Sequence, residues 1–445
     1  MNRPSDIVVA GGGPAGCCAA LGLQQLGYRV LLLATPRPWP SCEGFSARAL
    51  QGLRQAGLPS ALACASAASP RCATWNGASN DANSEHLVLR EALDQALLSD
   101  VSSAGVEIVA GQLGSIQAPE SGGCELQVRL ASGGNTTLAC SFLIDARGRA
   151  AGGGGNRLRG PESVSLVQVR QGQPGPGSSY LCSLPSGWAW LARTDGGRLF
   201  LQLTVSAEDG ALPPRKDLDS WFNDLLQPHQ DLLERIAGTS PAGPVFARGS
   251  TSILRDELVT GAVLRVGDAA MAVDPLSGNG VFQALSSALA APAVVNTLLQ
   301  YPDDRPVAEA FYRQRVEHLF LRFARTGRDF YRLEQRWPQE PFWRQRRDWP
   351  DDEPSHSDIP PRFLGLQTAP VLDGDRIRAA PVAITSDQPL GVWHVAGIRV
   401  APLLESLPDT SEARRQALLD RIIQTVSEPQ KAQLVRAWLQ RYGLL

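Results

Sequence analysis

The sequence predicts an α/β fold, α+β overall, in which a parallel sheet flanked by helices is combined with an antiparallel sheet and a small C-terminal α+β domain. Three observations support this prediction. A short apolar run near the N-terminus leads into a glycine-rich turn and a helical pattern, and alternating, β-rich sequence predicts antiparallel strands at 165–169, 187–191 and 198–205. A polar, proline-rich stretch, residues 350–361, then separates a last segment that has both strand and helix patterns. At 445 residues the chain is long enough for two or three lobes.

Composition excludes several classes of protein. A hydrophobic fraction of 43% with 19% charged residues is ordinary for a globular enzyme and too apolar for a disordered chain. The formal net charge of −2 gives no basic surface for nucleic acid, so no nucleic-acid partner is expected. We expect no apolar stretch of the roughly 20 residues that span a bilayer, and therefore no membrane partner and a cytoplasmic location. The eight cysteines are scattered and the histidines isolated, which predicts free thiols and no metal site.

The first element is a strand that runs directly into a glycine-rich turn. Residues 6–10, Asp-Ile-Val-Val-Ala, form a short β-rich run, and Gly11-Gly-Gly13-Pro14-Ala15-Gly16 follows. An apolar helix is expected over 17–26 and a second strand over 28–33. Strand, G-x-G-x-x-G, helix and strand in this order predict a Rossmann-like dinucleotide-binding domain of the FAD/NAD(P) type.

Each glycine of this motif has a different task. Gly11 allows a tight turn, Gly13 allows the backbone to approach a pyrophosphate, and Gly16 allows the helix to pack on the strand. Pro14 and Ala15 open the helix, whose N-terminus then points at the phosphates. We therefore expect all five residues at the cofactor.

The acid that usually follows the second strand of such a domain is missing. That residue binds the adenosine ribose, and its place here is taken by Ala34. Either Thr35, Arg37 or a backbone group makes the contact instead, or ribose binding is weaker than usual.

A second motif lies far along the chain. Residues 261–266 read as a buried strand that delivers Gly267-Asp268, and Asp274-Pro275-Leu-Ser-Gly278-Asn279-Gly280 follows. After this proline- and glycine-rich turn an apolar helix begins. The motif thus places an acid, a helix N-terminus and several small residues side by side.

These motifs together resemble the FAD-dependent monooxygenases of the para-hydroxybenzoate hydroxylase and tryptophan halogenase-like superfamily. The resemblance implies that Asp268, after Gly267, accepts hydrogen bonds from the ribityl chain of FAD. It also implies that Pro275 ends the loop after the strand. Gly278, Asn279 and Gly280 would then let the backbone amides that open the next helix approach the isoalloxazine ring, where the helix N-terminus stabilises negative charge.

Three further residues are implied at the cofactor by the same resemblance. The run Phe142-Leu-Ile-Asp145-Ala-Arg-Gly-Arg is similar to the Asp-Ala-x-Gly-Arg version of a strand that ends in an acid and a tight turn. Arg90 lies in a helix pattern whose arginine contacts flavin or its pyrophosphate, although a solvated helix face explains Arg90 equally well. Arg48 follows Glu43 in an amphipathic stretch and completes the set.

Two features separate the branches of the superfamily. A flavin-dependent halogenase needs an active-site lysine, and this chain has none before Lys216. Trp188-Ala-Trp190 only half matches the halogenase pattern Trp-x-Trp-x-Ile-Pro. Residues 42–57 and 70–77 instead resemble the QhpG-like, also LodB- and GoxB-like, flavoproteins of tryptophylquinone biogenesis, and the likeness covers roughly the first 330 residues.

This resemblance implies hydroxylation of a tryptophan side chain in a partner polypeptide, through a C4a-hydroperoxyflavin formed with O2, during biogenesis of a cysteine tryptophylquinone-type cofactor. The partner would be the quinone-bearing subunit of an amine dehydrogenase or oxidase, alone or with its other maturation factors. NAD(P)H or an electron-transfer partner would reduce the FAD. Glu43 is the candidate general base, and a structural hydrogen-bonding role is its alternative.

Other functions stay open at this point. They are a small-molecule aromatic hydroxylase, a halogenase-like enzyme or a reductase of the same fold, and a flavin-bearing assembly factor that does not oxygenate its partner. Trp188 and Trp190 would share one strand face, where they either line the substrate pocket or belong to the core.

The expected domains are discontinuous. The ranges are 1–160 and 245–305 for the FAD-binding domain, 161–244 and 306–350 for a substrate domain with a helical face, and 362–445 for the C-terminal domain. A single helix is expected over 218–236, a hairpin over 382–400 and two helices over 412–445. The arginine-rich helical segment 306–349 is either a solvated helix or a docking surface for an acidic partner, and the C-terminal domain serves partner recognition or caps the structure.

Overall fold

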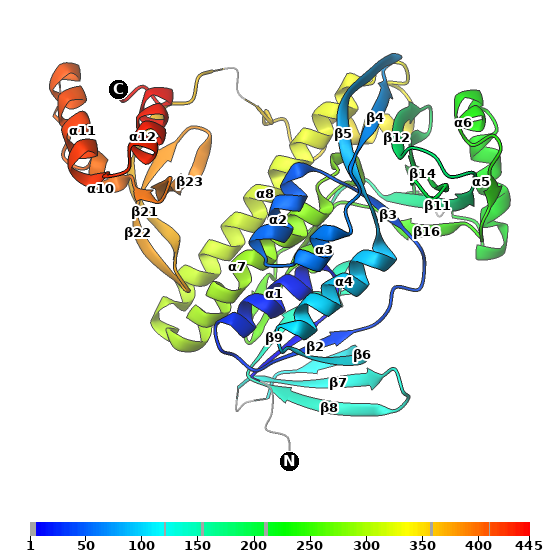
Figure 1. Ribbon diagram of the computed structural model, residues 1–445, viewed down its shortest axis with the longest axis horizontal. Coiled ribbons are helices and arrows are strands. Elements are labelled where there is room, and N and C mark those ends of the chain that lie inside the picture. The colour runs from blue at the N-terminus through cyan, green and yellow to red at the C-terminus, as the bar shows by residue number, and fades with distance from the viewer. Residues whose placement is uncertain (1–5, 120–121, 153–154, 209–211, 357–358, 409) are drawn as a thin grey trace. The chain divides into compact units, whose positions relative to one another are not determined.

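The computed structural model describes residues 6–119, 122–152, 155–208, 212–356, 359–408 and 410–445 (Figure 1). Two compact units are present: unit 1 comprises residues 1–292 and 316–353, and unit 2 comprises 293–315 and 354–445. Their boundaries fall within helices α7 (Gly280–Gln300) and α8 (Arg305–Leu333). The finer division into FAD-binding and substrate domains stays a prediction. Residues 357–358 of the predicted linker 350–361 lie outside the described residues, as do residues 153–154 of the predicted FAD-binding range.

An eight-stranded sheet forms the base of unit 1. Its five central strands, β19, β9, β1, β2 and β6, run parallel, so their carboxyl ends meet at one edge. Antiparallel strands extend it on both sides. The order is β18 (Val259–Thr260), β19 (Val263–Arg265), β9 (Phe142–Asp145), β1 (Ile7–Ala10), β2 (Val30–Ala34), β6 (Glu107–Gln117), β7 (Cys124–Leu130) and β8 (Asn135–Cys140).

Helix α1 (Pro14–Gln25) begins three residues earlier than the apolar pattern predicts. Proline suits the first helical turn because its fixed φ matches the helix and its missing N–H has no intrahelical partner there. The helix packs on β1, β2 and β9 and lies beside α4 (Arg90–Ser103) (Figure 1). A Cβ at Gly16 would lie 1.8 Å from the carbonyl oxygen of Gly11, so this close packing requires glycine.

A nine-stranded sheet forms the second layer of unit 1. The predicted strands are confirmed as β11, β13 and β14. The sheet also contains β12 and the β4–β5 hairpin, which the sequence pattern did not assign to this sheet. The sheet consists of β15 (Ser240–Pro241), β11 (Ser163–Gln171), β14 (Arg198–Ser206), β13 (Gly187–Arg193), β12 (Ser178–Leu184), β4 (Ala68–Trp75), β5 (Ala78–Leu89) and β3 (Cys42–Phe45), with β16 (Phe246–Gly249) also paired to β11.

One face of this sheet is covered by two short helices. Residues of β11–β14 form a buried core with Leu218, Phe222 and Leu232. The single helix predicted over 218–236 is wrong, because the chain forms α5 (Leu218–Leu226) and α6 (Gln230–Arg235). Pro228 lies between them, and a proline inside a helix removes a backbone donor and clashes with the preceding turn.

Helix α7 corrects the expectation that no apolar stretch is long enough to span a membrane. By length and composition it passes that test, but 72% of the residues in its apolar window are buried inside the structure. Burial of this extent is typical of a helix in a protein core, and an apolar helix needs such cover in water.

Arginines near the C-terminal end of α8 form ion pairs with the acidic stretch that follows in the same chain. Arg325 binds Asp351 at 2.9 Å, and Arg332 binds Asp352 at 3.1 Å. Helix α9 (Pro341–Arg347) lies between α8 and this stretch in sequence. These pairs reduce the positive charge at this end of the helix, and a docking surface for an acidic partner stays a prediction.

Unit 2 is a small α+β unit. The hairpin predicted over 382–400 is confirmed in part, because β22 (Arg376–Thr385) pairs with β23 (Gln388–Val392) in this range. Strand β22 begins earlier than predicted and also pairs with β21 (Phe363–Asp373) through a turn at Gly374, where φ is +64°. A short hairpin, β24 (His394–Val395) and β25 (Ile398–Arg399), leads to α10 (Ala401–Leu404), α11 (Ser411–Thr425) and α12 (Pro429–Arg441). The last two helices agree with the prediction.

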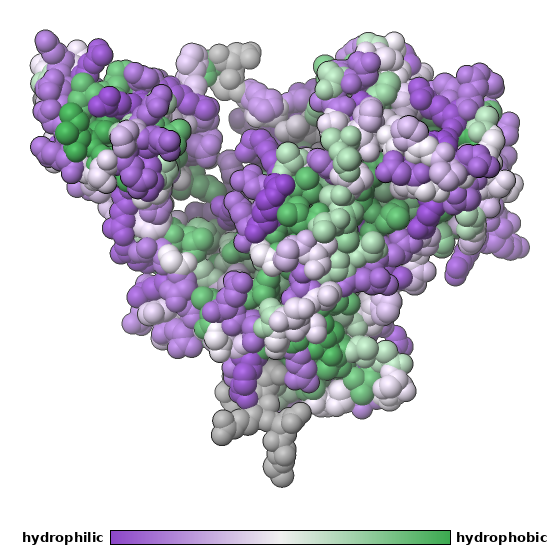
Figure 2. Space-filling model, viewed as in Figure 1, coloured by the Kyte–Doolittle hydropathy of each residue, from purple (hydrophilic) through white to green (hydrophobic). Residues whose placement is uncertain are grey.

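A hydrophobic patch lies over α11 (Figure 2). Ile423 on this helix is 68% exposed, and Leu434 on α12 is 56% exposed. A partner-recognition role for this unit stays a prediction.

Candidate cofactor and substrate site

A cavity of about 980 Å³ lies within unit 1, where the carboxyl ends of the parallel strands face one side of the antiparallel sheet. In open α/β sheets ligands bind at this edge. The volume is at the upper end of the range for small-molecule sites, about 300–1,000 Å³. The cavity can therefore accept a ligand as large as a dinucleotide at least in part.

Most of the predicted site residues line this cavity. They are Gly11, Gly13, Pro14, Ala15, Thr35, Arg37, Glu43, Arg90, Trp188, Trp190, Asp268, Pro275, Gly278 and Gly280. The structure thus brings together segments that are more than two hundred residues apart in sequence. Their roles in binding stay predictions.

Five predicted residues lie outside the lining, each for a visible reason. Gly16 packs on Gly11, and Gly267 packs on Ala15. The Asp145 carboxylate is 1% exposed and is held by the Arg147 guanidinium at 2.8 Å, so it orders the loop after β9. Arg48 is exposed on α2 (Ala47–Gln55), and the Asn279 amide donates to the Ser277 carbonyl at 2.6 Å.

The phosphate end of the cavity has the backbone geometry that the glycine motif predicts. Gly11 has φ of +120°, and a Cβ there would lie 2.3 Å from the carbonyl oxygen of Ala146, so the position requires glycine. A Cβ at Gly13 would meet nothing within 4 Å, and no side chain caps the N-terminus of α1 at this residue. Open space above uncapped amides at a helix N-terminus fits a pyrophosphate.

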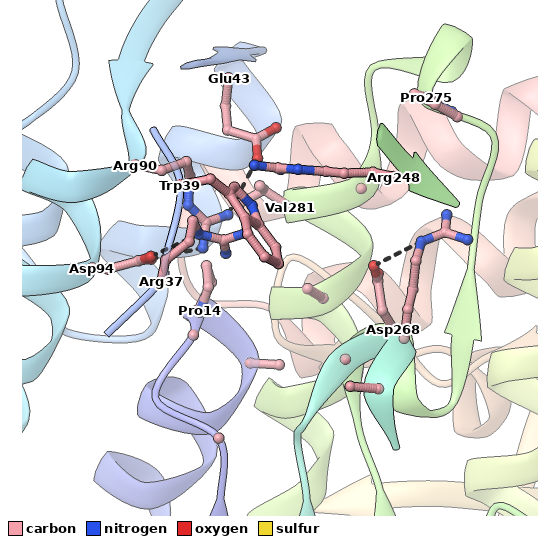
Figure 3. A pocket seen from close by; sticks show the side chains of 18 of the residues that line it. Pro14, Arg37, Trp39, Glu43, Arg90, Asp94, Arg248, Asp268, Pro275 and Val281 are labelled. Carbon is pink, nitrogen blue, oxygen red and sulfur yellow. Dashed lines mark hydrogen bonds and ion pairs between the residues drawn. The ribbon is translucent and has the colours of Figure 1, made fainter. Parts of the chain in front are cut away.

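A chain of ion pairs runs along the adenosine side. Arg90 binds Asp94 at 2.6 Å and Glu43 at 3.3 Å, and Arg37 binds Asp94 at 3.2 Å (Figure 3). Arg90 is 5% exposed, which excludes the solvated helix face. Burial opposes its charge, but Glu43 and Asp94 outweigh that effect and raise the pKa of Arg90. Glu43 is therefore engaged as the counter-ion of a buried arginine.

Arg248 is a lining residue that the sequence motifs did not indicate. It comes from β16, and its guanidinium lies over the ring of Trp39, 4.9 Å from the centroid (Figure 3). Its Nε and one Nη are buried without a partner among the described residues. Burial lowers the pKa of Arg248 to about 10, and nearby Arg37 adds to the effect. Unpaired buried donors next to other arginines fit an anionic ligand.

The second motif forms the opposite wall. Asp268 lies 3.6 Å from Arg149, and burial is the main cause that raises the pKa of Asp268. The Asp274 carboxylate accepts from the Leu276 amide and from the Tyr331 hydroxyl, both at 2.9 Å. Gly278 has φ of +61°, and α7 begins two residues later, so its N-terminus opens at the cavity.

The two predicted pocket tryptophans belong to the wall formed by β13. The Trp188 indole N–H donates to the Tyr331 hydroxyl at 3.2 Å, and this side chain is 2% exposed. The Trp190 indole N–H donates to Glu85 at 3.2 Å. Both rings pack in one aromatic cluster with Leu276 from the second motif. Trp188 thus packs in the hydrophobic core and also lines the cavity.

The residues present fit FAD. The uncapped helix N-terminus and Gly13 suit the pyrophosphate, and Asp268 suits the ribityl hydroxyls. The aromatic wall with Trp188 and Trp190 lines the same cavity as the second motif. The arrangement therefore places aromatic side chains beside the region where the flavin ring is expected.

Comparisons with known proteins agree with this geometry. Residues 6–173 match the lycopene cyclase protein family. The chain is 25% identical over 370 residues to the putative FAD-dependent oxidoreductase LodB of Marinomonas mediterranea, covering 77% of this chain and 96% of that protein.

Two solved structures extend the likeness over the whole chain. The first, the peptidyl tryptophan dihydroxylase QhpG, essential for tryptophylquinone cofactor biogenesis, has a TM-score of 0.83 and 40% identity over 100% of both chains. The flavin-dependent halogenase CmlS has a TM-score of 0.75 and 18% identity, covering 100% of this chain and 96% of that one. At that identity CmlS shows the shared fold alone.

Proposed function

The chain belongs to the QhpG-like family of FAD-dependent hydroxylases, and from this premise we propose that it hydroxylates a tryptophan side chain of a partner polypeptide during biogenesis of a cysteine tryptophylquinone-type cofactor. The observation that carries the proposal is the 40% identity to QhpG over the full length of both chains. The cavity supports it, because a phosphate-binding corner and an aromatic wall face the same space.

This chain's own residues bind and orient the two reactants. Gly11, Gly13 and the N-terminus of α1 would hold the pyrophosphate, and Asp268 would hold the ribityl chain. The segment from Pro275 to Gly280 would lie beside the flavin ring. Reduced FAD, when bound, would supply the electrophilic oxygen from O2, in the form of the C4a-hydroperoxide that the family resemblance implies. The aromatic wall keeps water away from the reacting atoms.

Hydroxylation is favoured over halogenation by the composition of the wall. Among the described residues that line the cavity there is no lysine, and the halogenase reaction depends on one. Arginines do not replace it, since a guanidinium stays protonated at neutral pH.

Reduction, partner and location complete the proposal. The reductant is NAD(P)H or an electron-transfer protein, and the substrate is the precursor of the quinone-bearing subunit of an amine dehydrogenase or oxidase. The reaction takes place in the cytoplasm, before that subunit is mature.

A single-turnover experiment tests the proposal. The FAD-loaded protein is reduced with dithionite without oxygen and then mixed with ¹⁸O₂ and a tryptophylquinone precursor polypeptide that carries its unmodified tryptophan. We expect ¹⁸O on that tryptophan by peptide mass spectrometry, and no label when only the water is ¹⁸O-enriched. An unchanged polypeptide would contradict the proposal, and hydroxylation of free tryptophan alone would indicate a small-molecule hydroxylase. A chlorinated peptide in chloride buffer would indicate a halogenase.

A further inference from the structure

A buried carboxylate stands in the aromatic wall of the cavity. Glu85, on β5, is 7% exposed and lines the cavity together with Trp188 and Trp190. One carboxylate oxygen accepts from the Trp190 indole N–H at 3.2 Å, and the other lies 4.0 Å from Arg71. Buried glutamates are rare unless they are paired or functional, and this one faces a ligand cavity.

The backbone opposite Glu85 is shaped for its carboxylate. Gly44, on the neighbouring strand β3, lies directly under the carboxylate, and a Cβ at this position would be 2.1 Å from the oxygen that faces Arg71. Any side chain at residue 44 would therefore displace the carboxylate. The position of Glu85 is thus fixed by Trp190 on one oxygen and by Gly44 beneath the other.

The other acids of the site are engaged elsewhere. Glu43 neutralises Arg90, at 3.3 Å, among the arginines of the adenosine side. Asp268 faces Arg149, at 3.6 Å, where the ribityl chain is expected. Asp274 accepts from the Leu276 amide and the Tyr331 hydroxyl, and it is absent from the cavity lining. The remaining acids of the lining are paired as well, Asp94 with Arg90 at 2.6 Å and Glu91 with Arg198 at 3.0 Å. Of these six acids only Glu85 is hydrogen-bonded to a tryptophan of the substrate wall.

We infer that Glu85 is the general base of the hydroxylation, an assignment that rests on the proposed function. Glu85 and both tryptophans line the same cavity, and Trp190 packs in one cluster with Leu276 of the segment expected to hold the flavin ring. The proposal places the substrate indole against this wall, next to the carboxylate.

The proton balance shows what the base does. Electrophilic oxygen forms a C–O bond to a ring carbon of the substrate indole, which leaves that carbon with both H and OH and gives the ring a positive charge. Glu85 takes the proton, the C–H electron pair returns to the ring, and the hydroxyindole forms. The two electrons for each hydroxylation come from reduced FAD, and the second oxygen atom of O2 leaves as water. The protonated Glu85 then releases its proton to solvent beside Arg71.

The test measures single turnovers of the FAD-loaded, reduced protein with O2 and the same precursor polypeptide. Glu85→Gln keeps the shape and the hydrogen bond from Trp190 but cannot take a proton. A positioned general base raises the reaction rate by about 10²–10⁴-fold. We therefore expect hydroxylation at least about 100-fold slower, with FAD binding retained. The matched control is Glu125→Gln, because Glu125 is exposed on β7, outside the cavity lining.

Two further measurements separate a base from a structural residue. With tryptophan deuterated on its indole ring, the wild type should show no isotope effect, whereas Glu85→Gln should show a clear one because proton loss has become slow. Formate should restore activity to Glu85→Ala, in which space for a small carboxylate has been opened. If Glu85→Gln does not fold, Glu85→Asp replaces it in the test. We then expect hydroxylation at least tenfold slower than in the wild type, together with an isotope effect.

The outcomes distinguish the two proposals. A wild-type protein that leaves the precursor unlabelled overturns the proposed function. A wild-type protein that labels the precursor, together with a Glu85 variant of equal rate and no isotope effect, overturns the assignment of Glu85 alone. A slow variant that shows neither an isotope effect nor rescue by formate also overturns it.

Discussion

Replacing single glycines of the first motif should separate cofactor affinity from stability. At Gly13 an added Cβ meets nothing within 4 Å, and φ is −84°. The free energy of unfolding of the apoprotein should therefore change by no more than about 0.5 kcal/mol in Gly13→Ala. At Gly16 the same atom would lie 1.8 Å from the Gly11 carbonyl oxygen, so the backbone must shift. The cost of such overpacking is about 1–3 kcal/mol, and Gly16→Ala should lie at the upper end.

The affinity for FAD should respond differently. In Gly13→Ala the new methyl group occupies the space over which the pyrophosphate approaches the helix N-terminus. Losing one hydrogen bond to a charged group costs about 1.5–3 kcal/mol. That loss corresponds to a dissociation constant for FAD roughly 10- to 150-fold higher. Gly13→Ala should therefore be a stable protein that binds FAD poorly.

The assay combines urea unfolding of the apoprotein with a fluorescence titration of FAD. Gly196→Ala is the matched control, because its Cβ also meets nothing within 4 Å and the residue lies outside the cavity lining. Both its stability and its FAD affinity should match the wild type. Wild-type affinity in Gly13→Ala would refute the placement of the pyrophosphate at this helix.

Three further predictions follow from packing and charge. Burial opposes ionisation of Glu334, but hydrogen bonds from Arg336 and Ser183 outweigh burial and lower the pKa of Glu334 to about 2. The ionised carboxylate therefore stabilises the fold above pH 4.5, and this stabilisation is lost as the pH falls toward 2. Glu334→Gln should lower the free energy of unfolding by roughly 3 kcal/mol at pH 7. Urea titrations should show that the difference in this free energy from the wild type shrinks below pH 4.5, and a difference independent of pH would contradict the prediction. Gly327 lies within α8, and an added Cβ there would have open space around it. Gly327→Ala should therefore raise the free energy of unfolding by about 1 kcal/mol, as thermal unfolding can measure, and a decrease would mean that the helix is strained at this position. Arg248→Gln should leave the apoprotein at least as stable as the wild type, because it removes buried unpaired donors. It should also weaken FAD binding, which melting curves of the apoprotein and the FAD-loaded protein can show. Equal FAD affinity would place Arg248 away from the cofactor.

Local backbone chemistry is what made the cofactor site predictable from the sequence. The turn at Gly11, the contact of Gly16 and the helix start at Pro14 all depend on residues within a few positions of one another. The same holds for the run from Pro275 to Gly280, where proline and glycine fix the turn and the helix start. Alternating polarity likewise predicted β11, β13 and β14, because each strand has one face against a core.

Long-range packing decided the rest of the site. Glu85 and Arg248 lie in ordinary strands, and each contacts a tryptophan distant along the chain, Trp190 for Glu85 and Trp39 for Arg248. Whether Glu43 is free or paired depends on Arg90, which is 47 residues away. The sequence alone therefore determines where a dinucleotide can approach the backbone, since that is a local property of glycine and of helix ends. Which charged side chains face the bound molecules depends on burial and on partners distant along the chain, and only the tertiary structure sets these.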